Sequence, residues 1–216
     1  MLPYHKFVYV VCAIAWMMVI VPMAKAQAHP AQQLVEQTTT KLIDAFASEK
    51  SRIDADPAAL RDVVGDIILP HFDFVRMSKL ALGKHWRKAS VAQRKEFATQ
   101  FRELLVNTYA KSLYKYADAK FTYRPTLADA GDKDVDVVSE VSSVNDAQPV
   151  DVVYSLHSKD GSWQVFNVTI EGVSLITNYR STFSEFVAKH GMDALNSDLE
   201  RRNRRIASGQ DEDEPA

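Results

Sequence analysis

The chain of 216 residues is 46% hydrophobic and 25% charged, a composition typical of one globular domain with a sizeable core. Its formal net charge of −2 at pH 7 argues against nucleic-acid binding, which usually requires a basic surface. The single cysteine, Cys12, excludes an internal disulfide framework.

The first 26 residues have the pattern of a secretory signal peptide. His5 and Lys6 precede an uninterrupted apolar run from Phe7 to Val21, and Ala24-Lys25-Ala26 fits a small-x-small cleavage site. The run is shorter than the roughly 20 residues that a membrane span needs. Cys12 lies inside it rather than at its end, which argues against lipidation. We therefore predict that residues 1–26 are cleaved, or residues 1–28 if the cut falls after Ala28, and that the mature chain, without a thiol, resides in a bacterial periplasm.

The mature chain begins with amphipathic helical patterns. Leu34, Val35, Leu42, Ile43 and Phe46 define the first, over residues 31–48. Asp56-Pro57 is a helix start signal, with a side-chain cap and a proline at the first position, and Pro70 ends the second helix. A third short helix is expected to end at Gly83.

A long helix is predicted over residues 90–117. Ser90 and Gln93 have the spacing of a capping box, in which each side chain bonds the backbone N–H of the other. Apolar residues then recur at three- and four-residue intervals, forming one aromatic-rich stripe: Phe97, Phe101, Leu104, Leu105, Thr108, Tyr109, Leu113 and Tyr116. The other face is polar and is expected to face water. Periodicity alone indicates that the stripe belongs to the core.

After residue 117 the hydrophobic period changes from 3.6 to 2. Alternating patterns predict four strands, around residues 121–123, 135–141, 150–156 and 163–169. Short polar turns join them, including Ser158-Lys159-Asp160-Gly161, and this arrangement indicates an antiparallel meander. The last strand has apolar residues at both its odd and its even positions, so both of its faces are expected to be covered.

Two helices complete the predicted domain. The first follows Gly172 and ends before Gly191, with Ile176, Tyr179 and Phe183 facing inward; the second, over residues 193–205, is expected to be short. The order of helices, sheet and helices predicts an α+β fold with helices packed on one sheet face. We expect a single domain over residues 27–205 and a disordered acidic tail over residues 206–216.

A search for catalytic motifs finds little. The sequence has no Gly-rich phosphate loop, no His-Glu-x-x-His and no Gly-x-Ser-x-Gly. The mature histidines are scattered without metal-ligand spacing. His71 and Asp73 could be a fragment of a site, but a helix cap at Asp73 is the simpler interpretation. No metal, no cofactor and no enzymatic activity are predicted.

Several separated motifs resemble the MlaC family of periplasmic phospholipid carriers, also called toluene-tolerance proteins. The resemblance covers about residues 34 to 200. It rests on these residues in order: Phe72-Asp73-Phe74, Arg76-Met77-Ser78, Leu82-Gly83, Trp86-Arg87, Gln93-Arg94, Phe101-Arg102, Leu105, Tyr109, Trp163, Glu171-Gly172-Val173-Ser174, Asn178-Tyr179-Arg180 and Phe183. Asn167 departs from the pattern, because such proteins often have an acidic residue there.

The resemblance implies an NTF2-like architecture in which the sheet and the amphipathic helices enclose an apolar cavity for the acyl chains of a phospholipid, bound as cargo. It also implies exchange of phospholipid with an inner-membrane ABC transporter complex that has an MCE-domain ring, and with an outer-membrane lipoprotein–porin complex. The expected role is to maintain the lipid asymmetry of the outer membrane.

The resemblance, with the apolar stripe, selects the residues expected to line this cavity. Val173 is placed at the cavity wall, so that a carboxylate there would be buried beside hydrocarbon, and Tyr109 should face the same space. The full predicted set is Phe74, Leu80, Leu82, Trp86, Phe97, Phe101, Leu105, Tyr109, Val152, Tyr154, Trp163, Val165, Val173, Ile176 and Tyr179.

Two other classes of function remain open from the sequence. The same fold hosts small-molecule isomerases and dehydratases, which place an acid–base pair inside the cone; the sequence suggests no inward pair of a histidine and a carboxylate. A periplasmic chaperone or adaptor would use an exposed apolar groove in place of a closed cavity.

Overall fold

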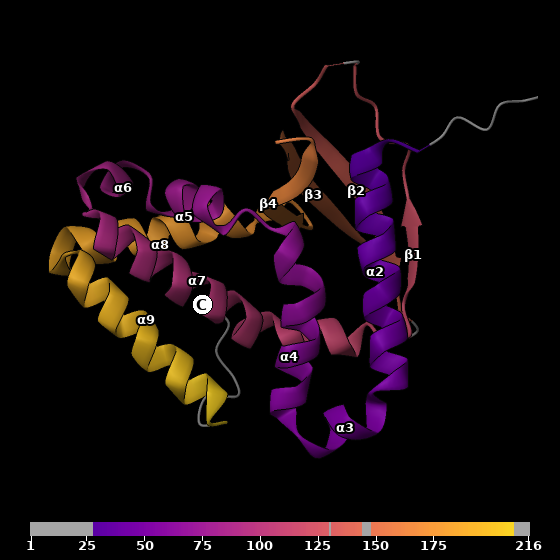
Figure 1. Cartoon of the computed structure of the whole chain (residues 1–216), viewed down its shortest axis with the longest axis horizontal. Coiled ribbons are helices and arrows are strands. Elements are labelled where there is room, and N and C mark those ends of the chain that lie inside the picture. The colour runs from indigo at the N-terminus through magenta and orange to yellow at the C-terminus, as the bar shows by residue number, and fades with distance from the viewer. Residues whose placement is uncertain (1–27, 130, 144–147, 210–216) are drawn as a thin grey trace, which may run out of the picture.

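A computed structural model of the chain describes residues 28–129, 131–143 and 148–209 (Figure 1). The predicted signal peptide and the acidic residues near the C-terminus lie outside the described residues. The helices are α2 (Pro30–Ser48), α3 (Lys50–Ala55), α4 (Pro57–Ile68), the 3₁₀ helix η2 (Leu69–His71), α5 (Phe74–Leu82), α6 (Lys84–Lys88), α7 (Val91–Lys115), α8 (Leu175–His190) and α9 (Met192–Ala207). The strands are β1 (Lys120–Tyr123), β2 (Asp134–Ser142), β3 (Val150–Lys159), β4 (Ser162–Ile170) and β5 (Val173–Ser174).

The predicted α+β fold is confirmed, with five strands in place of about four. All neighbouring strands are antiparallel, in the order β1-β2-β3-β4-β5. The additional strand, β5, follows a two-residue turn in which Glu171 and Gly172 have φ values of 49° and 81°. Positive φ at both positions is the geometry that matches the twist of a hairpin. Gly172 therefore turns the chain into another strand and does not end the sheet.

The β3–β4 hairpin has the predicted turn, with positive φ at Asp160 and Gly161. Farther along, the register shifts by one residue, so that Leu156 lies opposite Val165 while Ser155 lies opposite Asn167. Phe166 is the extra residue of this bulge. Val165 and Val168 consequently pack with α2, whereas Phe166 packs with the helices on the other side. Both faces of β4 are covered, as its apolar pattern predicts.

The helix ends follow the capping signals in the sequence. Ser90 and Gln93 form the capping box of α7, with N···O distances of 3.2 and 2.9 Å. Asp56 accepts a hydrogen bond from the Ala58 N–H at the start of α4. At Gly83, which ends α5, a Cβ atom would lie 3.0 Å from the Arg180 guanidinium, and the φ of 52° also favours glycine.

Two predictions about α7 and its partner helix are wrong. The last helix is not short, because α9 has 16 residues, as many as α8. The polar face of α7 is not left entirely to water either. Side-chain amides of Asn196 and Asn203 on α9 donate to the Gln93 and Gln100 carbonyls, at 3.2 and 2.9 Å. Bonds of this kind, from side-chain amides to backbone carbonyls, bury polar residues, and hydrophobic periodicity alone does not reveal them.

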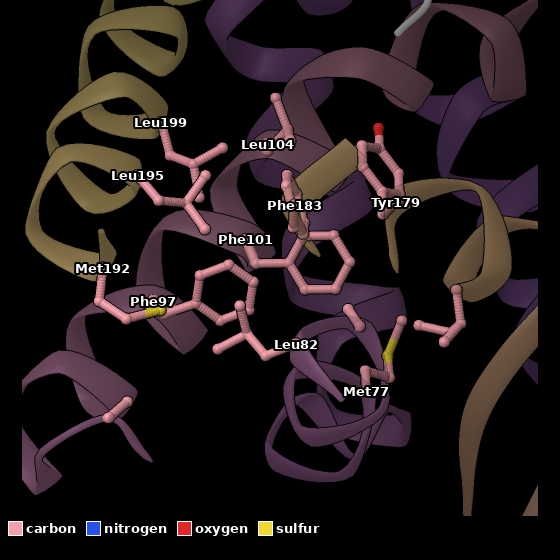
Figure 2. Packing of buried hydrophobic residues seen from close by; sticks show 13 residues of the cluster. Met77, Leu82, Phe97, Phe101, Leu104, Tyr179, Phe183, Met192, Leu195 and Leu199 are labelled. Atoms are coloured by element: carbon pink, nitrogen blue, oxygen red, sulfur yellow. The ribbon is translucent and has the colours of Figure 1, made fainter. Parts of the chain in front are cut away.

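Buried apolar side chains form three clusters. The α7–α8–α9 cluster contains Met77, Ala81, Leu82, Ala89, Phe97, Phe101, Leu104, Ile176, Tyr179, Phe183, Met192, Leu195 and Leu199 (Figure 2). The α2–α4 cluster contains Leu42, Phe46, Ile53, Leu60, Val63, Val64 and Ala110. The α2–sheet cluster contains Ala31, Val35, Val135, Val137, Leu156 and Val165.

Helix α7 joins the first two clusters, as Figure 1 shows by its course from α6 toward β1. Its first half supplies Phe97, Phe101 and Leu104 to one cluster, and Ala110 belongs to the other. The residues between them, 105–109, are half-buried. A domain of this size usually has one contiguous core. The division leaves partly covered apolar surface where the clusters adjoin.

Candidate functional site

The predicted cavity residues have three different environments in the structure. The buried ones are Leu82, Phe97, Phe101, Val152, Val165, Ile176 and Tyr179. The half-buried ones are Phe74, Leu80, Trp86, Leu105, Tyr109, Tyr154 and Trp163. Val173 is exposed.

The aromatic stripe of α7 packs against other aromatic rings. Phe97 and Phe101 are fully buried, and their ring centroids lie 5.3 and 5.5 Å from that of Phe183 in edge-to-face geometry. The Tyr179 ring lies 5.2 Å from Phe101 and stacks on Phe183 (Figure 2). Such pairs stabilise a core beyond their buried area. In this structure the N-terminal half of the stripe is therefore core, and its rings face one another.

The sheet carries a different apolar surface, a row of four directly opposed residues. Ser139 on β2 lies opposite Val152 on β3, Val152 opposite Ile170 on β4, and Ile170 opposite Val173 on β5. Directly opposed residues of antiparallel strands share one face. The exposed fractions along this row are 0%, 9%, 36% and 61%. We call these four residues the sheet row; it opens progressively toward β5.

Helix α2 covers the same sheet face farther along. Val137 and Val135 precede Ser139 on that face by two and four positions, respectively, and they pack against Ala31 and Val35 of α2. The cover ends before β5. Val173 does not have the enclosed position expected from the sequence, because a side chain there is open to water in this structure.

Several buried hydroxyls make no well-formed hydrogen bond. Among the described residues this holds for the Tyr123 hydroxyl and the Ser139 Oγ, which are on directly opposed residues and have the Thr39 and Tyr154 side chains beside them. In the α7–α8–α9 cluster the Tyr179 hydroxyl also makes no well-formed hydrogen bond; it points away from the Phe101 and Phe183 rings in Figure 2 and has Tyr109 and Thr108 beside it. Burial raises the pKa of Tyr154 to about 12, and burial followed by the nearby Tyr109 raises that of Tyr179. These phenols are neutral at physiological pH and keep a proton to donate.

The junction of β4, β5 and α8 fixes the orientation of Val173. The Asn167 Oδ1 accepts hydrogen bonds from the Ser174 hydroxyl at 3.0 Å and from the Ile176 N–H at 3.4 Å. Ser174 in turn caps α8 by accepting from the Thr177 N–H. The residue that departs from the family pattern thus has a structural role here. A neutral acceptor is sufficient to hold the start of α8 against the sheet.

The structure pairs a half-buried histidine with a buried carboxylate, a contact that the sequence did not suggest. His157 Nε2 lies 3.0 Å from Asp73 Oδ2, and Lys159 Nζ lies 3.4 Å from the same oxygen. Sequence reasoning missed it because 84 positions separate the two residues. His157 alternates with Leu156 along β3, so it lies on the sheet face opposite the sheet row.

Both carboxylate oxygens of Asp73 accept hydrogen bonds that have a structural role. Its Oδ1 accepts from the Arg76 N–H at 2.9 Å, which confirms the predicted helix cap, and its backbone N–H donates to the Val165 carbonyl. Burial alone would raise the pKa of the carboxyl, but Arg76, His157 and Lys159 together lower it below its ordinary value of 3.8. A carboxylate with a lowered pKa is a weak base, so the pair functions as a brace between α5 and the sheet.

The part of the chain that the structure describes holds no group of three or more His, Cys, Asp or Glu side chains suited to a metal ion. Within residues 28–129, 131–143 and 148–209, no helix is both long enough and apolar enough to span a bilayer.

Comparison with known proteins decides the family. The model of the MlaC protein family matches residues 36–201. The chain belongs to the MlaC family. It is 29% identical over 173 residues to the toluene tolerance protein ttg2D of Pseudomonas putida, with 80% of each chain covered. It is 24% identical over 164 residues to the intermembrane phospholipid transport system binding protein MlaC of Haemophilus influenzae, covering 75% of this chain and 77% of that one.

A solved structure supports the fold assignment. The phospholipid-binding protein from Ralstonia solanacearum, determined in complex with a phospholipid, is similar with a TM-score of 0.76 and 27% sequence identity. The similarity covers 83% of this chain and 99% of that protein. The α+β architecture described above is therefore one that holds a phospholipid in a relative.

Proposed function

We propose that this protein is a periplasmic phospholipid carrier whose acyl-chain site begins at the sheet row. The observation that supports this most directly is the graded exposure of apolar residues from Val152 to Val173. Valine and isoleucine exposed side by side on an ordered strand pair are what an unfilled apolar site presents to solvent. Membership in the MlaC family and the lipid complex of the Ralstonia solanacearum relative support the same ligand.

Of the remaining predicted residues, Tyr154 lies two positions from Val152 on the same strand face. Leu105 and Tyr109 of α7 are half-buried and pack against the α7–α8–α9 cluster, as Phe166 does. Other members, such as Phe97 and Phe101, would support the site by packing without touching the lipid in the present conformation. The hydroxyls of Ser139, Tyr123 and Tyr179 would donate to ester or phosphate oxygens, which a hydrocarbon ligand does not offer.

Carrying a phospholipid through water requires enclosure of its tails. Two tails of about 15 methylenes each would cost about 24 kcal/mol to expose, at about 0.8 kcal/mol per methylene. A partial cover such as that over the sheet row is insufficient for this. We infer that the helices beside the row close over the tails when lipid is bound, and that the head group stays near β5 and water.

The proposed partners follow from the family. A carrier exchanges lipid at both membranes, so we propose that it docks on an inner-membrane MCE-domain ABC transporter complex and on an outer-membrane lipoprotein–porin complex, and that it serves outer-membrane lipid asymmetry. Export by the predicted signal peptide of residues 1–26 would deliver it to the periplasm.

Neither alternative class has comparable support. An isomerase of this fold would need its acid–base pair inside the cone, whereas Asp73 and His157 lie on the opposite sheet face and brace α5. A chaperone would need a broad exposed apolar groove. The exposed part of the sheet row is narrow, because the neighbouring residues of the same sheet face are covered by α2.

Lipid uptake tests the proposal. Delipidated protein mixed with fluorescently labelled phospholipid should take up label in a saturable manner, and unlabelled phospholipid should displace it. Labelled cholesterol ester, which lacks a charged head group, serves as the control ligand. Failure to take up phospholipid by protein whose circular dichroism shows the native fold would overturn the proposal.

A further inference from the structure

The corner formed by α5, α6 and the start of α7 is unusually basic. Residues 74–95 contain seven lysines and arginines and no aspartate or glutamate, although the whole chain is net negative. Arg76 pairs with Asp134 at 3.0 Å. The four lysines of this stretch form no ion pair among the described residues: Lys79, Lys84, Lys88 and Lys95. Arg102, just beyond this stretch, pairs with Glu103 at 2.9 Å, but the unpaired lysines leave an excess of positive charge, which indicates an anionic partner outside the chain.

Exposed apolar side chains stand within this basic corner. Val91 is 80% exposed and Val75 is 59% exposed, on α7 and α5 respectively. Both line a surface pocket of about 420 Å³ whose other walls come from Phe74, Trp86, Arg94, Lys95, Ala98, Thr99 and Arg102. Lys79 lies one helical turn from Val75 on the same side of α5. Two of the predicted cavity residues, Phe74 and Trp86, line this pocket. Neither belongs to the sheet row.

Hydrogen bonds hold the side chains at the edge of this pocket in place. The Arg94 guanidinium donates from Nε to the Trp86 carbonyl at 2.8 Å and from Nη2 to the Arg87 carbonyl at 3.2 Å, and it lies 5.5 Å from the Trp86 ring centroid. These contacts fix an indole and a cation side by side at the pocket edge. Tryptophan beside arginine or lysine is typical of surfaces at a membrane–water boundary.

We propose that this basic corner, defined as Val75, Lys79, Trp86, Val91, Arg94, Lys95 and Arg102, docks the protein reversibly on an anionic phospholipid bilayer. Lysine and arginine side chains would approach the head groups while Val75 and Val91 enter the outermost apolar layer. A protein partner fits less well, because protein–protein interfaces are depleted in lysine, which recurs throughout this corner. The proposal concerns the protein surface and holds whether or not the sheet row binds cargo.

Vesicle flotation tests this with the mature full-length chain. The protein should float with vesicles of equal parts phosphatidylglycerol and phosphatidylcholine, and should not float with phosphatidylcholine alone. Binding should weaken strongly between low and high salt, because the charges are exposed. A basic residue near such a surface contributes about 1 kcal/mol, or about fivefold in binding. The double variant Lys79→Glu/Lys95→Glu should therefore bind at least about 25-fold more weakly.

Two further variants separate docking from net charge. Lys115→Glu/Lys120→Glu makes the same charge change at two exposed lysines at the far end of α7 and on β1, and it should bind like the original protein. Val91→Ser leaves every charge in place and should weaken binding about tenfold, the contribution of one buried valine side chain. Equal losses in both lysine pairs would show a diffuse charge effect and overturn the proposal.

Two other occupants of the corner are outcomes of the same experiment. Absence of binding by the full chain, followed by binding after removal of residues 210–216, would assign the corner to the chain's own acidic segment. Absence of binding in both forms would leave a protein as the partner. Either result overturns docking of the full mature chain on a bilayer, and neither alters the lipid-uptake assay of the proposed function.

Discussion

Replacing Val173 with glutamate places a carboxylate at the open end of the sheet row. Val173 is 61% exposed, so the carboxylate of the empty protein would be hydrated, and the free energy of unfolding should change by no more than about 0.5 kcal/mol. An acyl chain lying over the row would remove that water. Burying an unpaired carboxylate beside hydrocarbon costs several kcal/mol unless it becomes protonated. A cost of about 3 kcal/mol corresponds to about a hundredfold weaker lipid binding.

The assay combines lipid content with stability. Each variant is purified from the same host, extracted with organic solvent and analysed by mass spectrometry, and its unfolding is followed by circular dichroism in denaturant. Val173→Thr keeps the side-chain shape without charge and should retain most of the lipid. Leu127→Glu introduces the same carboxylate at a residue that is 93% exposed and outside the sheet row, and it should retain all of it.

The predicted pattern for Val173→Glu is a folded protein with little phospholipid. A folded Val173→Glu variant with the lipid content of the original protein would refute an acyl chain over the sheet row. Unfolding of this variant would refute the exposure of Val173 itself, because a charge is tolerated only where water reaches it.

Other substitutions test individual interactions. Phe101→Ala should lower the free energy of unfolding by about 4 kcal/mol in a denaturant titration, because the ring is fully buried among aromatic neighbours; a loss below 1 kcal/mol would contradict this packing. Asp73→Asn should cost about 2 kcal/mol at pH 7. Because the Asp73 pKa is lowered, its stabilisation is lost as the pH falls below 3.8, so the difference should shrink at pH 3, and a pH-independent difference would exclude this charge effect. Tyr179→Phe should change the stability of the empty protein by less than about 1 kcal/mol, because its hydroxyl makes no well-formed hydrogen bond, yet it should weaken lipid retention; unchanged retention would remove this hydroxyl from the site. Tyr109→Ala should weaken retention less than Val173→Glu in the same mass spectrometric assay, and the reverse order would place the tails along α7.

Local sequence signals were sufficient for most of the architecture. Three such signals are the capping box at Ser90 and Gln93, the helix start at Asp56-Pro57 and the turn at Asp160-Gly161. Each acts on backbone groups a few residues away, so the local sequence is enough to predict it. The fifth strand had such a signal too, in Glu171-Gly172, but two residues are too few for an alternating pattern to be recognised.

The candidate site depends on contacts between distant segments, and sequence reasoning reached less of it. Periodicity identified the α7 stripe as apolar but did not distinguish rings that fill a core from rings that line a cavity. The graded exposure of the sheet row comes from strand register and from where α2 ends its cover. The Asp73–His157 pair joins α5 to β3 across 84 positions, so no spacing rule predicts it.

Native mass spectrometry of the protein as purified from the periplasm tests the central claim most directly. Gentle ionisation should give a dominant species heavier than the mature polypeptide by the mass of one diacyl phospholipid, and collisional activation should release that lipid. The polypeptide mass alone, from protein with native circular dichroism that also takes up no added phospholipid, would contradict a carrier function.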